Sequence, residues 1–87
     1  MSRTHHGELL DVPERMIVAP SVGVFRPNVD AFADGDVVDA GDSIGVVEGP
    51  GTSTPVCSPF RGMLIGMLAH PGERLREGQP VAWMRVA

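Results

Sequence analysis

The side chains best suited to covalent chemistry lie in one short stretch of the sequence. Thr52, Ser53 and Thr54 carry hydroxyl groups between two prolines, and Cys57 follows as the only thiol. A catalytic cysteine needs a neighbouring histidine or cation that favours its thiolate, and the flanking residues supply neither. We therefore expect Cys57 to be an ordinary strand residue. A covalent handle at Cys57 (an intermolecular disulfide or a thioester) or at the three hydroxyls is the alternative.

The sequence contains no lysine, because all seven of its basic residues are arginines. A lysine amine is needed for a Schiff base, for a lysine general base and for a prosthetic group held through an amide to lysine. All three are excluded for this chain. No acid–base pair or activated nucleophile is evident either, so we predict that the chain has no enzyme active site.

Residues that could bind a metal ion occur in two places, and neither place has the spacing of a known site. His5 and His6 precede Glu8, but two adjacent histidines and one carboxylate do not define a structural site. Four aspartates between positions 34 and 42 lack the spacing of an EF-hand loop. We predict no metal site, and we expect these acids to form a solvated strand edge.

Length and composition predict one small soluble domain. The chain has 87 residues, 43% of them hydrophobic, which is too apolar for a disordered chain, and its eleven glycines and eight prolines argue against a helical bundle. No apolar stretch is long enough to cross a membrane, and residues 1–6 have no apolar secretion signal. The net charge of −4 argues against nucleic acid or a membrane as partner. A single cysteine fits the reducing cytoplasm, which is the expected location.

Charge is distributed unevenly along the chain. Residues 1–48 carry nine acids and three arginines, a net charge of −6, whereas residues 49–87 carry two acids and four arginines, a net charge of +2. Two solvated faces on one domain account for this difference. The alternative is that the opposite charges drive self-association into a homo-oligomer.

The sequence also contains an internal repeat. Residues 35–47 and 72–84 share the pattern Gly-acid-x-apolar-x-x-Gly-x-x-apolar, at a separation of 37 positions from Gly35 to Gly72. Upstream, residues 19–24 resemble residues 58–63 at a separation of 39 positions, and the Phe25–Asp34 loop absorbs the difference. Two matches in the same order predict a duplicated unit that folds with approximate two-fold symmetry.

Each repeat has the composition of short β-strands separated by glycine or proline. The expected strands are Ile17–Ala19, Val22–Phe25, Val37–Asp39, Ile44–Glu48, Val56–Ser58, Gly62–Leu68, Arg74–Arg76 and Val81–Val86. The paired glycines are expected at turns that require a positive φ. We expect an all-β domain of two packed antiparallel sheets at 16–87, with repeats at about 17–48 and 56–86, after a partly disordered arm at 1–15.

The repeated unit, with Ala-Pro or Ser-Pro before a strand that carries glycine, resembles the biotin/lipoyl attachment domain family, which includes biotin carboxyl carrier proteins. The resemblance covers residues 16–86. It implies a barrel-sandwich hybrid, a flattened β-barrel of two four-stranded sheets. In this family, a hairpin between the halves presents a lysine that carries biotin or lipoate, typically within Glu-Ala-Met-Lys-Met.

The resemblance also identifies the place where this chain departs from the family. An ungapped comparison puts Val46–Glu48 on the strand that enters the hairpin and Val56–Pro59 on the strand that leaves it. Gly51 then occupies the position of the modified lysine, within an expected tip at 49–55. We expect no biotin or lipoate on this chain. The expected partner contacts are Gly49, Pro50, Gly51, Thr52, Ser53 and Thr54.

The family implies a role as well as a fold. We expect a non-catalytic, carrier-like domain that docks as a structural or regulatory subunit on a biotin-dependent acyl-CoA carboxylase, such as acetyl-CoA carboxylase, or on a similar multi-subunit enzyme. Two alternatives stay open. One is a carrier or enzyme component that uses Cys57 or the Thr52–Thr54 hydroxyls as its handle, and the other is a self-assembling adaptor.

Overall fold

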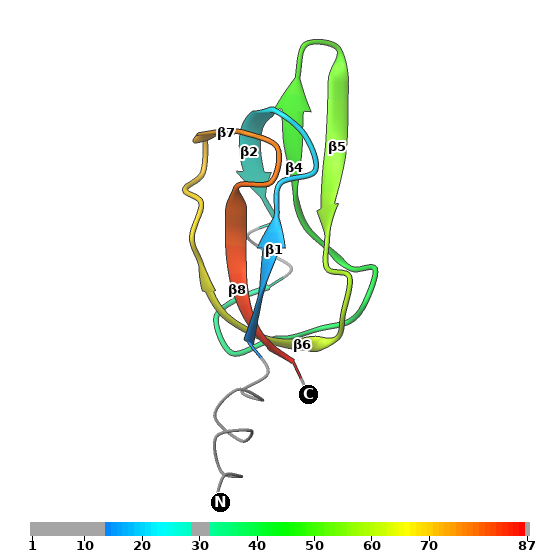
Figure 1. Ribbon diagram of the computed structural model, residues 1–87, viewed down its shortest axis with the longest axis vertical. Coiled ribbons are helices and arrows are strands. Elements are labelled where there is room, and N and C mark those ends of the chain that lie inside the picture. The colour runs from blue at the N-terminus through cyan, green and yellow to red at the C-terminus, as the bar shows by residue number, and fades with distance from the viewer. Residues whose placement is uncertain (1–13, 29–31, 87) are drawn as a thin grey trace, which may run out of the picture.

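The computed structural model describes residues 14–28 and 32–86, and in these ranges the chain forms strands and turns without a helix (Figure 1). The expected N-terminal arm lies outside the described residues as far as position 13. Within the described residues, eight strands follow one another: β1 (Glu14–Val18), β2 (Gly23–Pro27), β3 (Val37–Val38), β4 (Ser43–Gly49), β5 (Thr52–Cys57), β6 (Gly62–Met67), β7 (Arg74–Leu75) and β8 (Pro80–Val86).

The strands form two four-stranded antiparallel sheets. The first sheet has the order β1-β8-β6-β3, and the second has the order β5-β4-β2-β7. Consecutive strands lie mostly in different sheets, so the chain winds between two layers that face each other. The predicted all-β class and the barrel-sandwich hybrid are confirmed.

The internal repeat is visible in the topology. If β1 to β4 are exchanged with β5 to β8 in order, each sheet is converted into the other. The register follows the same rule, because Phe25 pairs with Val47 in the second sheet and Leu64 pairs with Met84 in the first. Each half therefore contributes two strands to each sheet, and the two halves interlock.

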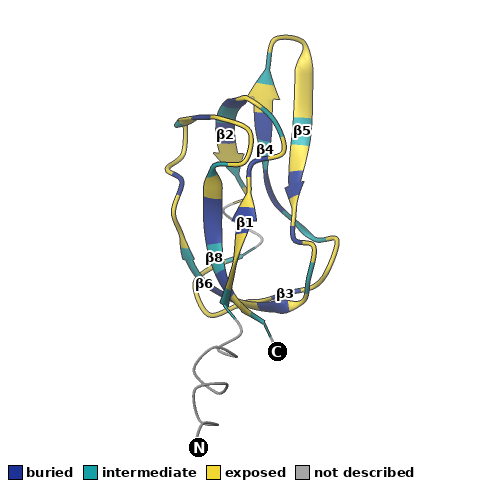
Figure 2. Ribbon diagram, viewed as in Figure 1, coloured by how far each residue is buried: buried dark blue, intermediate teal, exposed yellow. Residues whose placement is uncertain are grey.

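The core lies between the two sheets (Figure 2). Period-2 alternation along the strands turns one set of side chains inward, and Phe25, Val38, Leu64, Leu75 and Met84 are each at most 1% exposed. Phe25 and Leu64 occupy equivalent positions of the two halves, as do Val38 and Leu75. Equivalent positions therefore fill the core with side chains of different size.

The Gly-acid element of the repeat forms a turn in each half. Gly35 and Gly72 have φ of 94° and 81°, in the left-handed region that strains other residues. The carboxylates of Asp36 and Glu73, which follow them, each accept a hydrogen bond from the backbone N–H three residues earlier, at 2.9 and 2.8 Å. Asp42 closes the next turn in the same way, at 3.0 Å. The spacing of these acids is therefore explained by turn closure.

Two strands begin at least three residues earlier than expected. β1 begins at Glu14, inside the range expected for the arm, and β5 begins at Thr52 instead of Val56. The composition of residues 52–55 is that of a loop, yet they pair with β4 along the edge of the second sheet. Pro55 lies opposite Val46, three pairs along the hairpin from the Gly49–Thr52 pair that closes the turn. Because hydrogen-bonded and non-hydrogen-bonded pairs alternate in an antiparallel ladder, the nitrogen of Pro55 points away from β4. An edge strand tolerates proline at such a position.

Candidate partner-binding hairpin

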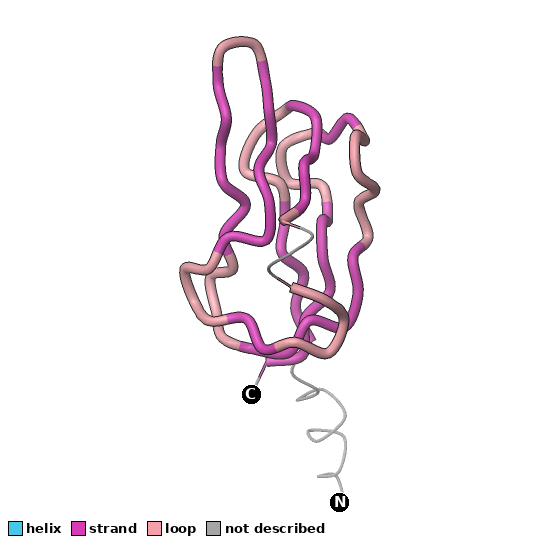
Figure 3. Tube along the Cα trace, turned by 180° about the vertical axis from the view of Figure 1, so that it is seen from behind, coloured by secondary structure: helices cyan, strands magenta, loops and turns pink. Residues whose placement is uncertain are grey.

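Strands β4 and β5 form a hairpin that projects beyond the other strands at one end of the sandwich (Figure 1, Figure 3). Gly49 pairs with Thr52, so only Pro50 and Gly51 form the loop. The proline ring fixes a negative φ, and Gly51 has a φ of 70°, which is the combination of a type II turn. Most of the expected 49–55 tip is thus paired strand.

The six residues predicted to contact a partner all lie on this hairpin. Gly49 ends β4, the next two residues form the turn, and Thr52, Ser53 and Thr54 begin β5. Positions 50–53 are exposed, whereas Gly49 and Thr54 are half-buried. None of the six carries a charge, so the tip offers hydroxyl groups and backbone atoms to a partner. Counted from the tip, the first charged side chain on β4 is Glu48, whose carboxylate forms an ion pair with Arg26 of β2 at 3.1 Å.

At Gly51 there is space for a side chain, but the backbone conformation would be strained for any residue other than glycine. A Cβ atom at Gly51 would have no neighbour within 4 Å, so a side chain there would extend into solvent. The positive φ would cost such a residue about 1–2 kcal/mol. Glycine satisfies this turn without strain, and it brings no group to which a prosthetic group could be joined.

A comparison with protein-family models identifies the fold family. Residues 15–84 match the biotin/lipoyl model, described as "Biotin-requiring enzyme", and this range includes both repeats and the hairpin between them. The chain belongs to the biotin/lipoyl family. The family resemblance predicted from the repeat is therefore confirmed. No curated protein matched this biotin/lipoyl domain in a sequence comparison.

Solved structures that resemble this biotin/lipoyl domain include those of two carboxylases. A single-chain, multi-domain long-chain acyl-CoA carboxylase superposes over 86% of this chain, with a TM-score of 0.75 and 19% identity. The urea carboxylase of Kluyveromyces lactis superposes over 82%, with a TM-score of 0.71 and 26% identity. This chain spans only 7% and 6% of those two chains. In both proteins the shared fold is thus a small part of a much longer polypeptide.

Cys57, the other candidate handle of this biotin/lipoyl domain, lies away from the tip. It is exposed and ends β5, whereas Thr52 begins that strand next to the turn. The three tip hydroxyls lie three to five residues from Cys57 along β5, which corresponds to about 10–17 Å. The thiol and the tip hydroxyls therefore belong to separate places on the surface.

Metal ligands are not brought together in the part of the chain that the structure describes. No three histidine, cysteine, aspartate or glutamate side chains lie close enough there to hold an ion. His5, His6 and Glu8 lie outside the described residues. Within the described ranges, nothing forms a helix with the length and apolar character needed to cross a membrane.

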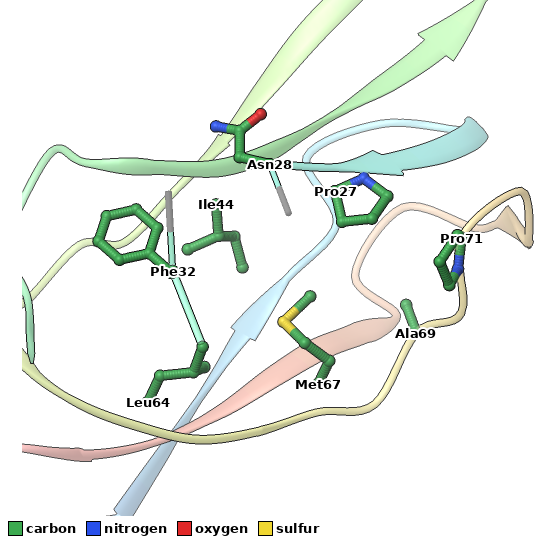
Figure 4. Close-up of a pocket in the computed structure, with 8 residues that line it drawn as sticks. All are labelled: Pro27, Asn28, Phe32, Ile44, Leu64, Met67, Ala69 and Pro71. Atoms are coloured by element: carbon green, nitrogen blue, oxygen red, sulfur yellow. The ribbon is translucent and has the colours of Figure 1, made fainter. Parts of the chain in front are cut away.

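A cavity of about 200 Å³ opens between the sheets of this biotin/lipoyl domain (Figure 4). Among the described residues that line it, only Asn28 has a polar side chain, and that amide donates to the Ser43 carbonyl at 3.0 Å. The other lining residues are apolar and include Phe32 and Met67. None of these described lining residues has a titratable side chain. Sequence inspection missed it because its walls come from segments distant in the chain.

Proposed function

We propose that this biotin/lipoyl domain is a carrier-like domain without a modifiable lysine, and that it carries neither biotin nor lipoate. It would act in the cytoplasm as a non-catalytic structural or regulatory accessory subunit. Its partner would be a biotin-dependent acyl-CoA carboxylase or a similar multi-subunit enzyme. It would occupy the docking site of a carrier there, and the hairpin tip at residues 49–54 would make the contact.

One observation carries the proposal: the projecting hairpin is retained, but its exposed turn ends in Gly51 and the 87-residue sequence holds no lysine. Attachment of biotin through an amide needs an amine, and arginine guanidinium groups do not supply one. The likeness to parts of an acyl-CoA carboxylase and a urea carboxylase supports the choice of partner class. The uncharged tip supports docking, because a neutral hairpin is less costly to desolvate on binding than a charged one.

Affinity capture from the source organism tests the proposal directly. The unmodified chain should retain carboxylase subunits, identified by mass spectrometry of bait and prey. Thr52→Arg at the exposed tip should reduce their recovery at least about tenfold, as expected when a charge is desolvated without a partner. Ala40→Arg adds the same charge at an exposed turn outside the hairpin, and it should leave recovery unchanged. Equal recovery with both variants, or no carboxylase subunit with the unmodified chain, would contradict the proposal.

Introducing a lysine at the tip tests whether the hairpin still has the geometry of a carrier. Gly51→Lys, co-expressed with a biotin protein ligase, is expected to gain the mass of one biotinyl group. The parent chain should stay unmodified. Because position 51 is open and tolerates a side chain at a cost of about 1–2 kcal/mol, the variant should still fold. Intact-mass measurement of both proteins gives the result.

A matched control separates the hairpin from a merely exposed lysine. Gly35 also has a positive φ, 94°, and no atom within 4 Å of its Cβ position, but it lies in the turn before β3. Gly35→Lys therefore carries a similar strain and should remain unmodified. A folded Gly51→Lys protein without biotin would show that this tip does not present position 51 as a carrier does.

The second candidate function keeps the carrier role on another residue. Cys57, Thr52 and Ser53 are all exposed, which favours a covalent handle at one of them. Intact mass of the chain purified from its native host distinguishes the two proposals. A stable added group at any of these three residues would favour the second, whereas an unmodified chain that still captures carboxylase subunits would favour the first.

A further inference from the structure

The projecting hairpin leaves one long backbone edge of the second sheet open to solvent (Figure 1, Figure 3). β5 stands at the end of the order β5-β4-β2-β7, so within the described residues only one of its sides pairs with another strand. Four of its six residues are exposed, namely Thr52, Ser53, Pro55 and Cys57. An open edge of this kind can add a strand of another molecule, which leads to aggregation.

In the described part of the chain, the other three sheet edges are protected by short length or by charge. β3 and β7 have two residues each, which is too short to hold an added strand. β1 has five residues, and Glu14 and Arg15 place a charge of each sign at its start. β5 has six residues, none of them charged, and two are threonines, which favour strands. Neither length nor charge therefore protects β5.

The net charge of the whole chain does not protect this edge either. Between Ser43 and Cys57, the only charged residue is Glu48. Its carboxylate forms an ion pair with Arg26 at 3.1 Å. The hairpin is therefore close to neutral, although the chain carries a net charge of −4. Because repulsion between two such hairpins is weak, protection of the edge has to come from another feature.

Pro55 lies near the middle of this edge, and its nitrogen faces outward. The Gly49–Thr52 pair closes the turn, and the alternation of pairs from there directs the backbone groups of Ser53 and Pro55 away from β4. Ser53 offers both an N–H and a carbonyl to an added strand, whereas Pro55 offers a carbonyl alone. The proline ring also occupies the space from which a carbonyl of the added strand would approach. Such a strand would lose a hydrogen bond and meet the ring.

The internal repeat indicates that the fold does not require a proline at this position. Met16 on β1 is the equivalent of Pro55, at the separation of 39 positions that relates the upstream parts of the two repeats. The register agrees, because Met16 pairs with Trp83, and Pro55 pairs with Val46, the equivalent of that tryptophan. Methionine is therefore compatible with the same place on a sheet edge.

The two equivalent edges carry different protective residues. By the same separation, Glu14 and Arg15 on β1 correspond to Ser53 and Thr54 on β5. These positions and the next one therefore hold two charges and no proline on β1, but a proline and no charge on β5. Charged residues and proline are alternative ways of blocking an exposed edge. Each edge has one of them, which is the distribution expected if each edge needs protection.

We propose that Pro55 is a protective residue, which prevents the open edge of β5 from pairing with the same edge of a second copy of this chain. The hydroxyl side chains of the tip then stay available to a partner, while the backbone beside them does not add strands without selectivity. This role concerns the free chain, so it holds or fails independently of the carboxylase partner proposed above.

Sedimentation velocity of the full chain tests the proposal, under reducing conditions that exclude a disulfide at Cys57. Pro55→Thr restores the N–H and adds a side chain that favours strands, so its weight-average mass should rise at least about twofold above that of the parent as concentration increases. Pro55→Ala restores the same N–H and should act in the same direction. Amide hydrogen exchange locates the contact, because Ser53 should exchange fast in the parent and slowly in the associated variants.

Two matched controls separate the edge from a general effect of proline removal. Pro59→Thr replaces an exposed proline that lies between β5 and β6, and it should leave the mass at the parent value. Ser53→Glu and Thr54→Arg, added to Pro55→Thr, copy the charges of β1 onto the edge of β5. This triple variant should return to the mass of the parent. Thermal unfolding of each variant confirms that it is folded.

Each outcome decides the proposal. Association of the Pro55 variants that the two added charges reverse, with slow exchange at Ser53, supports it. Folded Pro55 variants that keep the mass of the parent at every concentration overturn it, and so does equal association of Pro59→Thr. A Ser53 amide that is already protected in the parent also overturns it, because the edge would then be paired in spite of the proline.

Discussion

Gly23→Ala is expected to lower the free energy of unfolding by about 2–5 kcal/mol, which combines overpacking with a strained backbone. A Cβ atom at Gly23 would lie 2.5 Å from the carbonyl oxygen of Glu48 and 2.7 Å from a methyl group of Val47. The carbonyl belongs to the backbone of β4, and it cannot move without disturbing the pairing of β2 with β4. A domain of this size has only about 4–11 kcal/mol of stability to lose.

The repeat supplies a second site and a control for this prediction. Gly62 is the equivalent residue, and its Cβ would lie 2.5 Å from the carbonyl oxygen of Arg85 on β8. Gly62→Ala should therefore be destabilising as well. Gly66 lies in the same strand as Gly62 with nothing within 4 Å, so Gly66→Ala should change stability by less than about 1 kcal/mol. Urea unfolding followed by Trp83 fluorescence compares the three, and equal stability of all would disprove the close-approach argument.

Phe25→Ala is expected to cost about 3–5 kcal/mol, the usual range for removing a buried phenylalanine side chain. Phe25 is fully buried between the sheets. Its ring lies against Gly45, because a Cβ atom there would be 2.8 Å from ring atom Cε1. No large side chain can collapse into the space from that side. The same urea unfolding measurement gives the difference in free energy.

The other half of the molecule again provides the control. Leu64 occupies the position equivalent to Phe25, and Ala82 the one equivalent to Gly45. A leucine is therefore compatible with this place in the fold, and Phe25→Leu should cost no more than about 1.5 kcal/mol. If Phe25→Leu were as destabilising as Phe25→Ala, the two halves would not share a core geometry in the way that the register indicates.

Most of the strands could be predicted from sequence because their signals are local. Branched residues between Gly or Pro marked all eight strands, and the positive φ of Gly35, Gly41, Gly72 and Gly78 follows from their places in the repeat. β5 was underestimated because Thr52 to Pro55 have loop composition. Their strand conformation comes from pairing with β4, which is a contact between strands and not a local preference.

The hairpin turn was predicted in position but not in shape. Gly51 was placed by resemblance, and the structure puts it in the exposed turn of the projecting hairpin. The number of residues in that turn depends on the pairing register of β4 and β5, which a single sequence does not specify. Which methionines of the first sheet face solvent could not be assigned from sequence for a related reason. Met16 and Met63 alternate with inward-facing residues that are equally apolar, so the pattern does not reveal which set faces solvent.

The interlocked halves have a consequence for the order of the chain. The exchange that relates the sheets also relates the β4–β5 hairpin to the β8–β1 pair, where Glu14 lies beside Arg85. One end of the sandwich is therefore closed by the Pro50–Gly51 turn, while the matching end is left open by the described ends of the chain. A circular permutant that links residue 86 to residue 14 and begins at residue 51 would contain the same two sheets. The fold thus determines which strands are neighbours, but it is compatible with chain termini at either of these two ends.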